Sequence, residues 1–336
     1  MKASQRRFTE RGSFSPWSAT ILLIVTGCDG PQSTLDPAGH GAEQIAALFW
    51  AMAAGAGLIW LGIVGLALYA IQGSAGGHDR RLALLIIGGG TVLPTVVLAG
   101  LLAYGLALLP TLLAPAPEGS LTIAVSGEQW WWRVRYLRSE GEHLELANEI
   151  RLPVGERIEF QLDSPDVIHS FWIPALGGKI DMIPGRQTRL ALEPTRTGVF
   201  RGVCAEYCGT SHALMGFSVV VLETQDFARW LENQAEPAQP PTQPLALRGQ
   251  QLFLSTGCGA CHTVRGTLAD GVVGPDLTHV GSRLSLGAGS LPNEQPDFVR
   301  WLTHTQKVKP GSHMPAFDML PTEEVDALAA YLDGLT

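Results

Sequence analysis

Residues 204–215 read CAEYCGTSHALM and contain two thiols, an imidazole and a thioether that can bind a soft metal, namely those of Cys204, Cys208, His212 and Met215. A further histidine, His169, lies thirty-five residues before Cys204. Two thiolates, two imidazoles and a thioether are soft ligands that suit copper better than magnesium or calcium. A single blue-copper ion would leave the second cysteine without a role, whereas two thiolates can bridge two coppers. The alternative is a disulfide between the two cysteines, with the methionine filling the core.

Short β-rich segments, broken by Gly and Pro, surround this stretch. They are Leu121–Val125, Arg157–Leu162, Thr188–Leu192 and Phe217–Leu222. The pattern predicts an antiparallel β-sandwich or barrel of about 100 residues, followed by a short helix at Thr224–Gln234.

The next segment, residues 235–244, is rich in Pro and predicts a semi-rigid, extended linker between two folded units. Beyond it the pattern is helical, at Leu245–Leu254, Asp297–Thr305 and Thr322–Leu335. Thr322 is expected to be the N-cap of the last helix.

Residues Cys258–His262 spell C-x-x-C-H, the attachment motif of c-type haem. The two thiols would bond the haem vinyl groups, and His262 would bind the iron. A redox dithiol and half of a zinc site are the alternatives. An electron carrier needs a sixth iron ligand, for which Met314 is the candidate. Its competitors are Met319, His279, His304 and His313.

The composition predicts a membrane part, because 46% of the 336 residues are hydrophobic and only 16% are charged. Charged residues are missing between Glu43 and Asp79, and again between Arg81 and Glu118. Each gap exceeds the roughly 20 apolar residues that a bilayer requires, so transmembrane helices are predicted at 45–71 and 82–109. The loop between them carries two arginines, which places it in the cytoplasm and the later domains outside.

Residues 1–27 have a basic start and an apolar run, as a signal peptide does. Val25–Cys28 resembles a bacterial lipobox, which implies acylation of Cys28; an ordinary signal peptide is the alternative. The net charge of −8 excludes nucleic acid as a natural partner, because phosphate binding needs a basic surface.

The pattern C-x-E-x-C-x₃-H-x₂-M with an upstream His resembles the binuclear CuA centre of cytochrome c oxidase subunit II. The resemblance implies a cupredoxin domain in which Cys204 and Cys208 bridge both coppers. It further implies that His169 and Met215 complete one copper, and that His212 and the carbonyl oxygen of Glu206 complete the other.

Gln129–Trp132 resembles the aromatic stretch of that family near the point where electrons enter, with Trp130 as the contact. The alternative is an ordinary core or interface aromatic. The resemblance also implies that the Glu206 side chain helps to hold a magnesium ion at the interface with subunit I; one carboxylate cannot bind the ion alone.

The C-terminal part resembles an all-α class I cytochrome c domain, with Pro275 of Gly274–Leu277 packed beside His262, and Met314-Pro315 in the distal loop. The whole chain resembles subunit II of a caa3-type oxidase. The implied division is a signal peptide at 1–27, two membrane helices within 28–117, a CuA domain at 118–234, the linker at 235–244 and cytochrome c at 245–336.

The resemblance implies a subunit of the bacterial inner membrane that passes electrons from haem c to CuA, and then to haem a of subunit I, where oxygen is reduced. The expected donor is a cytochrome c or an upstream respiratory complex, and the acidic surface suits a basic donor. The linker is expected to keep the haem domain at a millimolar effective concentration near CuA. The alternatives are the corresponding subunit of a CuA-type nitric oxide reductase and a stand-alone lipid-anchored copper and haem carrier.

Overall fold

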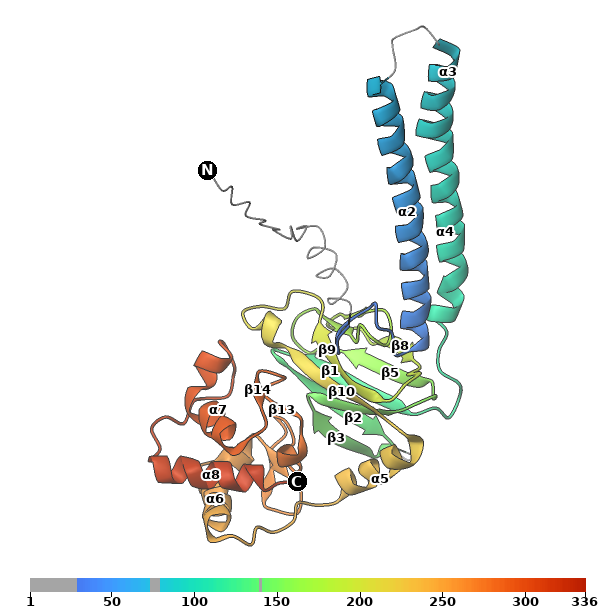
Figure 1. The fold of residues 1–336 in the computed structure, drawn as a ribbon. Helices are drawn as coiled ribbons and strands as arrows, with labels where there is room; N and C mark the ends of the chain where they lie inside the picture. The colour runs from blue at the N-terminus through green and yellow to red at the C-terminus, as the bar shows by residue number, and fades with distance from the viewer. Residues whose placement is uncertain (1–28, 73–78, 139–140) are drawn as a thin grey trace, which may run out of the picture.

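The computed structural model describes residues 29–72, 79–138 and 141–336. Two long apolar helices lead into a β-sandwich, and a helical C-terminal domain lies at the end of the sandwich away from those helices (Figure 1). This order confirms the multi-domain fold class predicted from the sequence. The predicted signal peptide and Cys28 lie outside the described residues.

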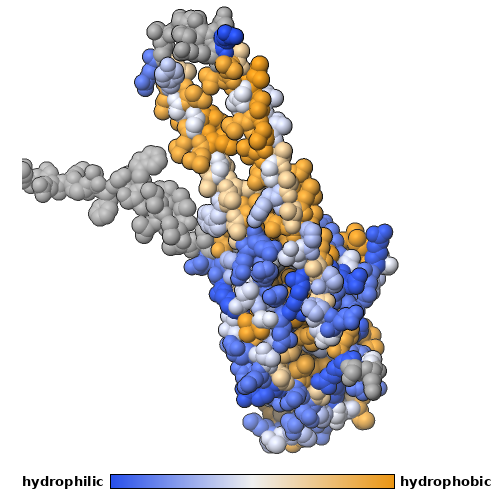
Figure 2. Space-filling model, turned by 90° about the vertical axis from the view of Figure 1, so that its right-hand side faces the viewer, coloured by the Kyte–Doolittle hydropathy of each residue, from blue (hydrophilic) through white to orange (hydrophobic). Residues whose placement is uncertain are grey.

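The first apolar helix is α2 (His40–Gln72). The second begins with α3 (Asp79–Leu84), continues through the π-helical segment η1 (Leu85–Val92) and ends with α4 (Leu93–Leu112). Both helices are long and apolar enough to cross a membrane, the first over His40–Gln72 and the second over Leu82–Leu112. Figure 2 shows the hydrophobic surface of these helices against the largely hydrophilic globular part.

Backbone contacts fasten the base of the apolar helices to the β-sandwich. The amide of Ala42 donates to the carbonyl of Leu176 at 3.2 Å. A Cβ atom at Gly39 would lie 2.5 Å from the same carbonyl oxygen, so only glycine permits this close approach. On the second helix's side, Arg157 donates to the carbonyl of Ala114 at 2.7 Å.

The β-sandwich consists of two five-stranded sheets. One sheet has the order β3 (His143–Ala147), β2 (Trp131–Leu137), β1 (Thr122–Glu128), β5 (Ile158–Asp163) and β8 (Thr188–Leu192). The other has the order β4 (Glu149–Pro153), β10 (Gly216–Leu222), β9 (Gly198–Cys204), β6 (His169–Trp172) and β7 (Ile180–Met182).

The prediction of a wholly antiparallel sandwich is wrong, because each sheet contains one parallel pair. Strand β1 pairs in parallel with β5, and β10 pairs in parallel with β4. In each pair the chain leaves one strand and returns beside it only after crossing to other strands. Strand alternation predicts which face of a strand is buried, but it carries no information on which strands become neighbours.

Aromatic rings fill the space between the two sheets. Phe171 stacks on Phe217 with ring centroids 5.0 Å apart, and Trp132 meets Phe217 edge-on at 5.0 Å. A Cβ atom at Gly202 would lie 2.0 Å from the Phe217 ring, so this ring occupies the room that a side chain would need. The rigid core therefore supports the residues at the end of β9.

The remaining helices are α5 (Thr224–Ala235), α6 (Pro244–Ser255), α7 (Gln295–Val308) and α8 (Thr322–Asp333), with 3-10 turns η3 (His212–Leu214), η4 (Cys258–Ala260) and η5 (Val280–Ser282). Two hairpins, β11 (Thr263–Val264) with β12 (Ala269–Asp270) and β13 (Ser285–Leu286) with β14 (Leu291–Pro292), interrupt the otherwise helical C-terminal domain. The predicted N-cap is wrong by one residue: Pro321 caps α8, and Thr322 is its first residue.

The Pro-rich segment after α5 is fastened to the C-terminal domain, whereas the sequence predicted a spacer between separate units. Arg265 donates to the carbonyls of Ala235 and Gln234 at 2.9 and 2.6 Å. The amide of Ala238 donates to the carbonyl of Arg265 at 2.9 Å. These bonds fasten the end of α5 and the start of the linker to the C-terminal domain.

Candidate metal centre and haem-attachment segment

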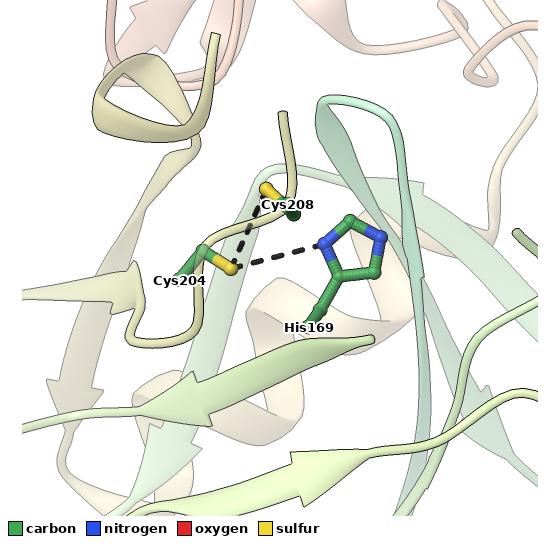
Figure 3. Close-up of side chains that lie close together, drawn as sticks. All are labelled: His169, Cys204 and Cys208. Carbon is green, nitrogen blue, oxygen red and sulfur yellow. Dashed lines mark hydrogen bonds between the residues drawn. The ribbon is translucent and has the colours of Figure 1, made fainter. Parts of the chain in front are cut away.

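His169 is the first residue of β6, and strand pairing brings it to the cysteines. Residue Phe171 lies opposite Cys204 in the β6–β9 ladder. The His169 side chain is fully buried, and its Nε2 lies 2.9 Å from Asp166 Oδ1. The other ring nitrogen, Nδ1, lies 3.8 Å from Cys204 Sγ, as Figure 3 shows. The carboxylate therefore fixes the ring with Nδ1 toward the sulfur.

The two cysteines lie at the end of β9 and in the loop after it, with their sulfur atoms 3.8 Å apart (Figure 3). Both are buried free thiols. A disulfide needs sulfurs about 2.05 Å apart, so this arrangement does not contain the alternative Cys204–Cys208 bond. The carbonyl oxygen of Glu206 lies 3.2 Å from Cys204 Sγ. The backbone therefore adds an oxygen beside the sulfur pair.

The last two members of the group follow in the turn η3 and just after it. His212 Nδ1 lies 3.5 Å from Cys208 Sγ, and the Met215 sulfur lies 3.8 Å from the same atom. The amide of Cys204 donates to the carbonyl of Met215 at 3.1 Å, which ties the loop's two ends together. Thus all six groups that the sequence singled out here lie around one sulfur pair.

The protonation of the sulfur pair is coupled, because two neighbouring thiolates repel each other. Contact with Cys208 lowers the pKa of Cys204, and the same contact raises the pKa of Cys208. Burial by itself lowers the pKa of His169, but its contacts with Cys204 and Asp166 outweigh burial and raise it. A cation placed between the sulfurs would favour loss of both thiol protons.

The chemistry of these donors fits a two-copper centre. His169 lies beside Cys204 while Met215 lies beside Cys208. In the same way the carbonyl of Glu206 lies beside Cys204 while His212 lies beside Cys208. Of the two ligands predicted for each copper, besides the cysteines, one therefore lies beside Cys204 and the other beside Cys208. Sulfurs that bridge two coppers require this arrangement. Soft sulfur and imidazole donors favour copper over hard cations.

Trp130 lies between this centre and the C-terminal domain. Its side chain is 7% exposed, and Nε1 donates to the carbonyl of Cys208 at 3.0 Å. On the other side, a Cβ atom at Gly311 would lie 2.8 Å from the Trp130 ring, so the loop backbone rests directly on the ring. The tryptophan is thus a largely buried aromatic that touches both domains.

The Glu206 carboxylate points to a different partner from its carbonyl. Its Oε2 lies 3.8 Å from Lys179 Nζ, and both side chains are nearly half exposed. Lys179 also lies 3.4 Å from Asp181. Within the described residues, Lys179 is therefore the cation that lies beside the carboxylates of Glu206 and Asp181.

The C-x-x-C-H segment forms the turn η4, with Cys258 half-buried and Cys261 exposed. His262 Nδ1 donates to the carbonyl of Pro275 at 2.8 Å, which leaves Nε2 as the nitrogen with a free lone pair. Burial lowers the pKa of His262, which favours the neutral ring that iron binding requires. A Cβ atom at Gly274 would lie 2.5 Å from the ring, and glycine therefore permits this packing.

The candidates for the opposite iron ligand differ in burial. Met314 is half-buried against the core of the C-terminal domain, whereas Met319 is 72% exposed. Of the competing histidines, His279 is buried and bonds the carbonyl of Glu236 through Nε2 at 3.0 Å, while His304 bonds Thr303 at 2.7 Å. The packing favours Met314.

Sequence reasoning missed two residues of this region. Asp166 orients His169, and its place three residues before that histidine was the available signal. Lys309 is 3% exposed and bonds the carbonyl of Leu214 between two candidate copper ligands. Burial lowers the pKa of Lys309 to about 7. Nothing in the local sequence marks this lysine, because its burial comes from contact between domains.

A buried pair of cysteine sulfurs with copper-type ligands and a haem-attachment segment in one chain are typical of proteins that transfer electrons. Comparison with known proteins agrees with this class. Residues 135–223 match the family of the periplasmic domain of cytochrome c oxidase subunit II, and residues 246–336 match the cytochrome c family.

Among the relatives, cytochrome c oxidase subunit 2 of Alkalihalophilus pseudofirmus is 41% identical over 224 residues, which are 66% of this chain and 64% of that relative. Subunit 2 of Candida albicans is 33% identical, and the match covers 52% of this chain and 77% of that relative. The solved periplasmic domain of subunit II from Bradyrhizobium japonicum is 36% identical, with a TM-score of 0.33, and covers 36% of this chain and 96% of that domain.

The chain belongs to the cytochrome c oxidase subunit II family. It carries a cytochrome c domain after the periplasmic domain, and is consistent with the caa3 type. The two domains imply a binuclear CuA centre and a haem c as cofactors.

Proposed function

We propose that this chain is the subunit through which electrons enter a haem–copper cytochrome c oxidase. Electrons from a reduced cytochrome or an upstream respiratory complex pass through haem c to CuA, and then to haem a of subunit I, where oxygen is reduced to water. The observation that carries the proposal is the contact between the loop before Met314 and the loop that contains His212 and Met215. A chain built for direct transfer needs its two redox segments side by side.

In the copper centre, each residue has a role that follows from its place. Cys204 and Cys208 would hold both ions. His169 and Met215 would be the further ligands of one ion, and His212 and the Glu206 carbonyl those of the other. Asp166 accepts a hydrogen bond from His169 Nε2, so that Nδ1 is presented to the metal. The buried core below β9 holds these donors in one geometry, which limits rearrangement when the charge of the centre changes.

In the C-terminal domain, Cys258 and Cys261 hold the haem covalently, and His262 and Met314 bind its iron. The Pro275 carbonyl orients His262 by accepting the hydrogen bond from Nδ1. A haem held by both His262 and Met314 would carry electrons and would not bind oxygen, and a Met ligand would raise its potential. The role that follows is electron transfer.

The proposal also covers the membrane anchor, the side of the membrane on which the domains lie, and the contact with subunit I. The two apolar helices anchor the chain as a multi-pass protein in the bacterial inner membrane and pack against subunit I. Both redox domains lie on the periplasmic side, because the chain is exported. Cys28 carries a lipid. The proposed domain limits are a signal peptide at 1–27, two membrane helices within 28–117, a CuA domain at 118–234, a linker at 235–244 and cytochrome c at 245–336. The Glu206 carboxylate helps to hold magnesium once subunit I displaces Lys179 from it.

Purification of the complex from membranes tests this function. We expect a haem–copper subunit I, oxygen consumption driven by reduced cytochrome c, and a lipid on Cys28 by mass spectrometry of the mature N-terminus. Consumption of nitric oxide without oxygen reduction would identify a nitric oxide reductase instead. A chain that is extracted alone, without a catalytic partner, would identify a stand-alone carrier.

A further inference from the structure

Lys309 is buried at the contact between the two redox domains. Its side chain is 3% exposed, and its Nζ donates to the carbonyls of Leu214 at 2.9 Å and Gly287 at 2.8 Å. Removing an ammonium group from water is costly unless polar partners replace the water. Here the two carbonyls come from different domains, so the lysine connects them.

The connection lies on the copper-ligand loop itself. Leu214 stands between His212 and Met215, which are both proposed ligands. Beside it, Ser211 Oγ donates to the carbonyl of Pro310 at 2.6 Å. On the other side, the amide of Gly216 donates to the carbonyl of Ala288 at 3.1 Å. Residues 211–216 are therefore held by three consecutive interdomain contacts.

On the haem side, the connection begins at the distal loop. Lys309 lies five residues before Met314, and Gly311 between them rests on the Trp130 ring. The contact thus joins the loop of the proposed iron ligand to the loop of two proposed copper ligands. Only a short stretch of backbone separates the contact from the proposed ligands on each side, so the two loops have little room to move relative to each other.

A second area of contact prevents rotation about the first. Arg133 of the β-sandwich donates to the carbonyls of Val272 and Val273 at 3.1 and 3.3 Å, in the loop just before Gly274. The amide of Leu284 donates to the Glu149 carboxylate at 2.8 Å. Two separated areas define both the distance and the orientation of the domains.

We propose that Lys309 is a positioning residue that fixes the Met314 loop on the copper-ligand loop, so that the cytochrome c domain stays in one docked arrangement during electron transfer. The contact itself is independent of the proposed function, and only its kinetic consequence rests on that function. In this arrangement Trp130 is covered by the protein's own haem domain, and a soluble donor reaches the haem first.

Lys309→Met tests the proposal, because it keeps most of the side-chain volume and removes the donors. Leu214 and Gly287 then lose a hydrogen bond, and the docked arrangement becomes one of several populated states. We expect electron transfer from haem c to CuA to slow by about tenfold, because the competent state is populated for a smaller fraction of the time. Lys307→Met is the matched control, since Lys307 is exposed two residues away.

The measurement is flash photoreduction of haem c in the purified complex with a soluble ruthenium tris-bipyridine, followed at the haem and copper absorption bands. In Lys309→Met the transfer should also slow further as glycerol raises the viscosity, because a domain must move before the electron can. The wild type and Lys307→Met should show no viscosity dependence. Transfer in Lys309→Met at the wild-type rate and without viscosity dependence would overturn the proposal.

Hydrogen–deuterium exchange of the same complex tests the contact without any electron transfer. Peptides that contain Gly216 should exchange faster in Lys309→Met and at the wild-type rate in Lys307→Met. If Lys309→Met fails to acquire haem, Ser211→Ala takes its place, with faster exchange at Gly216 as support and wild-type exchange as contradiction. If the wild type shows no transfer to copper at all, the proposed function fails while the exchange result still decides the role of Lys309.

Discussion

His169 shows how single residues prepare the copper centre. Its ring is buried, with Nε2 bonded to Asp166 and Nδ1 3.8 Å from Cys204 Sγ. Both ring nitrogens therefore have defined neighbours, and the ring cannot turn without breaking a buried hydrogen bond. On the haem side, the Pro275 carbonyl does the same for His262.

Replacing both cysteines, Cys204→Ser with Cys208→Ser, should abolish the near-infrared absorption of CuA. Serine oxygens are hard donors and do not bridge copper as thiolates do. The haem c spectrum of the same chain is the internal control, since its attachment residues are unchanged. Persistence of the near-infrared band in the double variant would show that the copper assignment is incorrect.

Met314→Ala should convert haem c to a form with lower potential or high spin, because the iron loses its thioether ligand. Met319→Ala is the matched control, since that side chain is 72% exposed. Optical spectra and a redox titration of both variants provide the measurement. An unchanged spectrum in Met314→Ala, or a changed one only in Met319→Ala, would refute the assignment.

The metal-binding residues were predictable because their spacing is local: five of the six copper donors lie within residues 204–215, and the haem motif within residues 258–262. Asp166 and Lys309 were not predicted. Asp166 was missed although it stands only three residues before His169. Lys309 acts through contacts that exist only after folding, with partner loops 95 and 22 residues away.

At the scale of elements, segments with a clear pattern were predicted well. Strand β8 has the predicted limits, Thr188–Leu192, and α5 extends the predicted helix by one residue. The pairing of β1 with β5 was missed because neighbours in a sheet depend on long-range packing. The cap of α8 was misplaced because Pro321 fits an extended N-cap without providing the side-chain bond that Thr typically gives.

Gly249→Ala should destabilise the cytochrome c domain, although alanine favours helices by about 1 kcal/mol over glycine. A Cβ atom at this position of α6 would lie 2.0 Å from the carbonyl oxygen of Ala327 in α8. The helices must move apart, which costs about 1–3 kcal/mol. Denaturant unfolding followed by haem absorbance measures the change, with the exposed Gln251→Ala in the same helix as control. Increased stability in Gly249→Ala would contradict this packing.

At the scale of the whole molecule, the haem domain is docked against the surface of the copper domain. Arg265 fastens the linker, and Arg133 and Lys309 join the two domains at two further places. The sequence predicted only a tether that raises effective concentration. The docked arrangement could not be predicted, because the acceptors of these hydrogen bonds are backbone carbonyls. Every residue has one, so the sequence does not mark those that are used.

Trp130→Phe should slow electron transfer from haem c to CuA by about an order of magnitude. The variant loses the indole N–H that donates to Cys208 and part of the ring that touches Gly311. Reduction of haem c by a soluble donor should stay unchanged, because the donor does not reach the covered tryptophan. Trp230→Phe on α5 is the control. An unaltered internal rate in Trp130→Phe would remove this residue from the route.

The most direct test of the account is flash reduction of haem c in the wild-type complex at several protein concentrations. The account predicts that haem c is reoxidised as the near-infrared CuA band bleaches, with one first-order rate that does not depend on concentration. A rate proportional to concentration, or reoxidation of haem c with no change at the copper band, would contradict it.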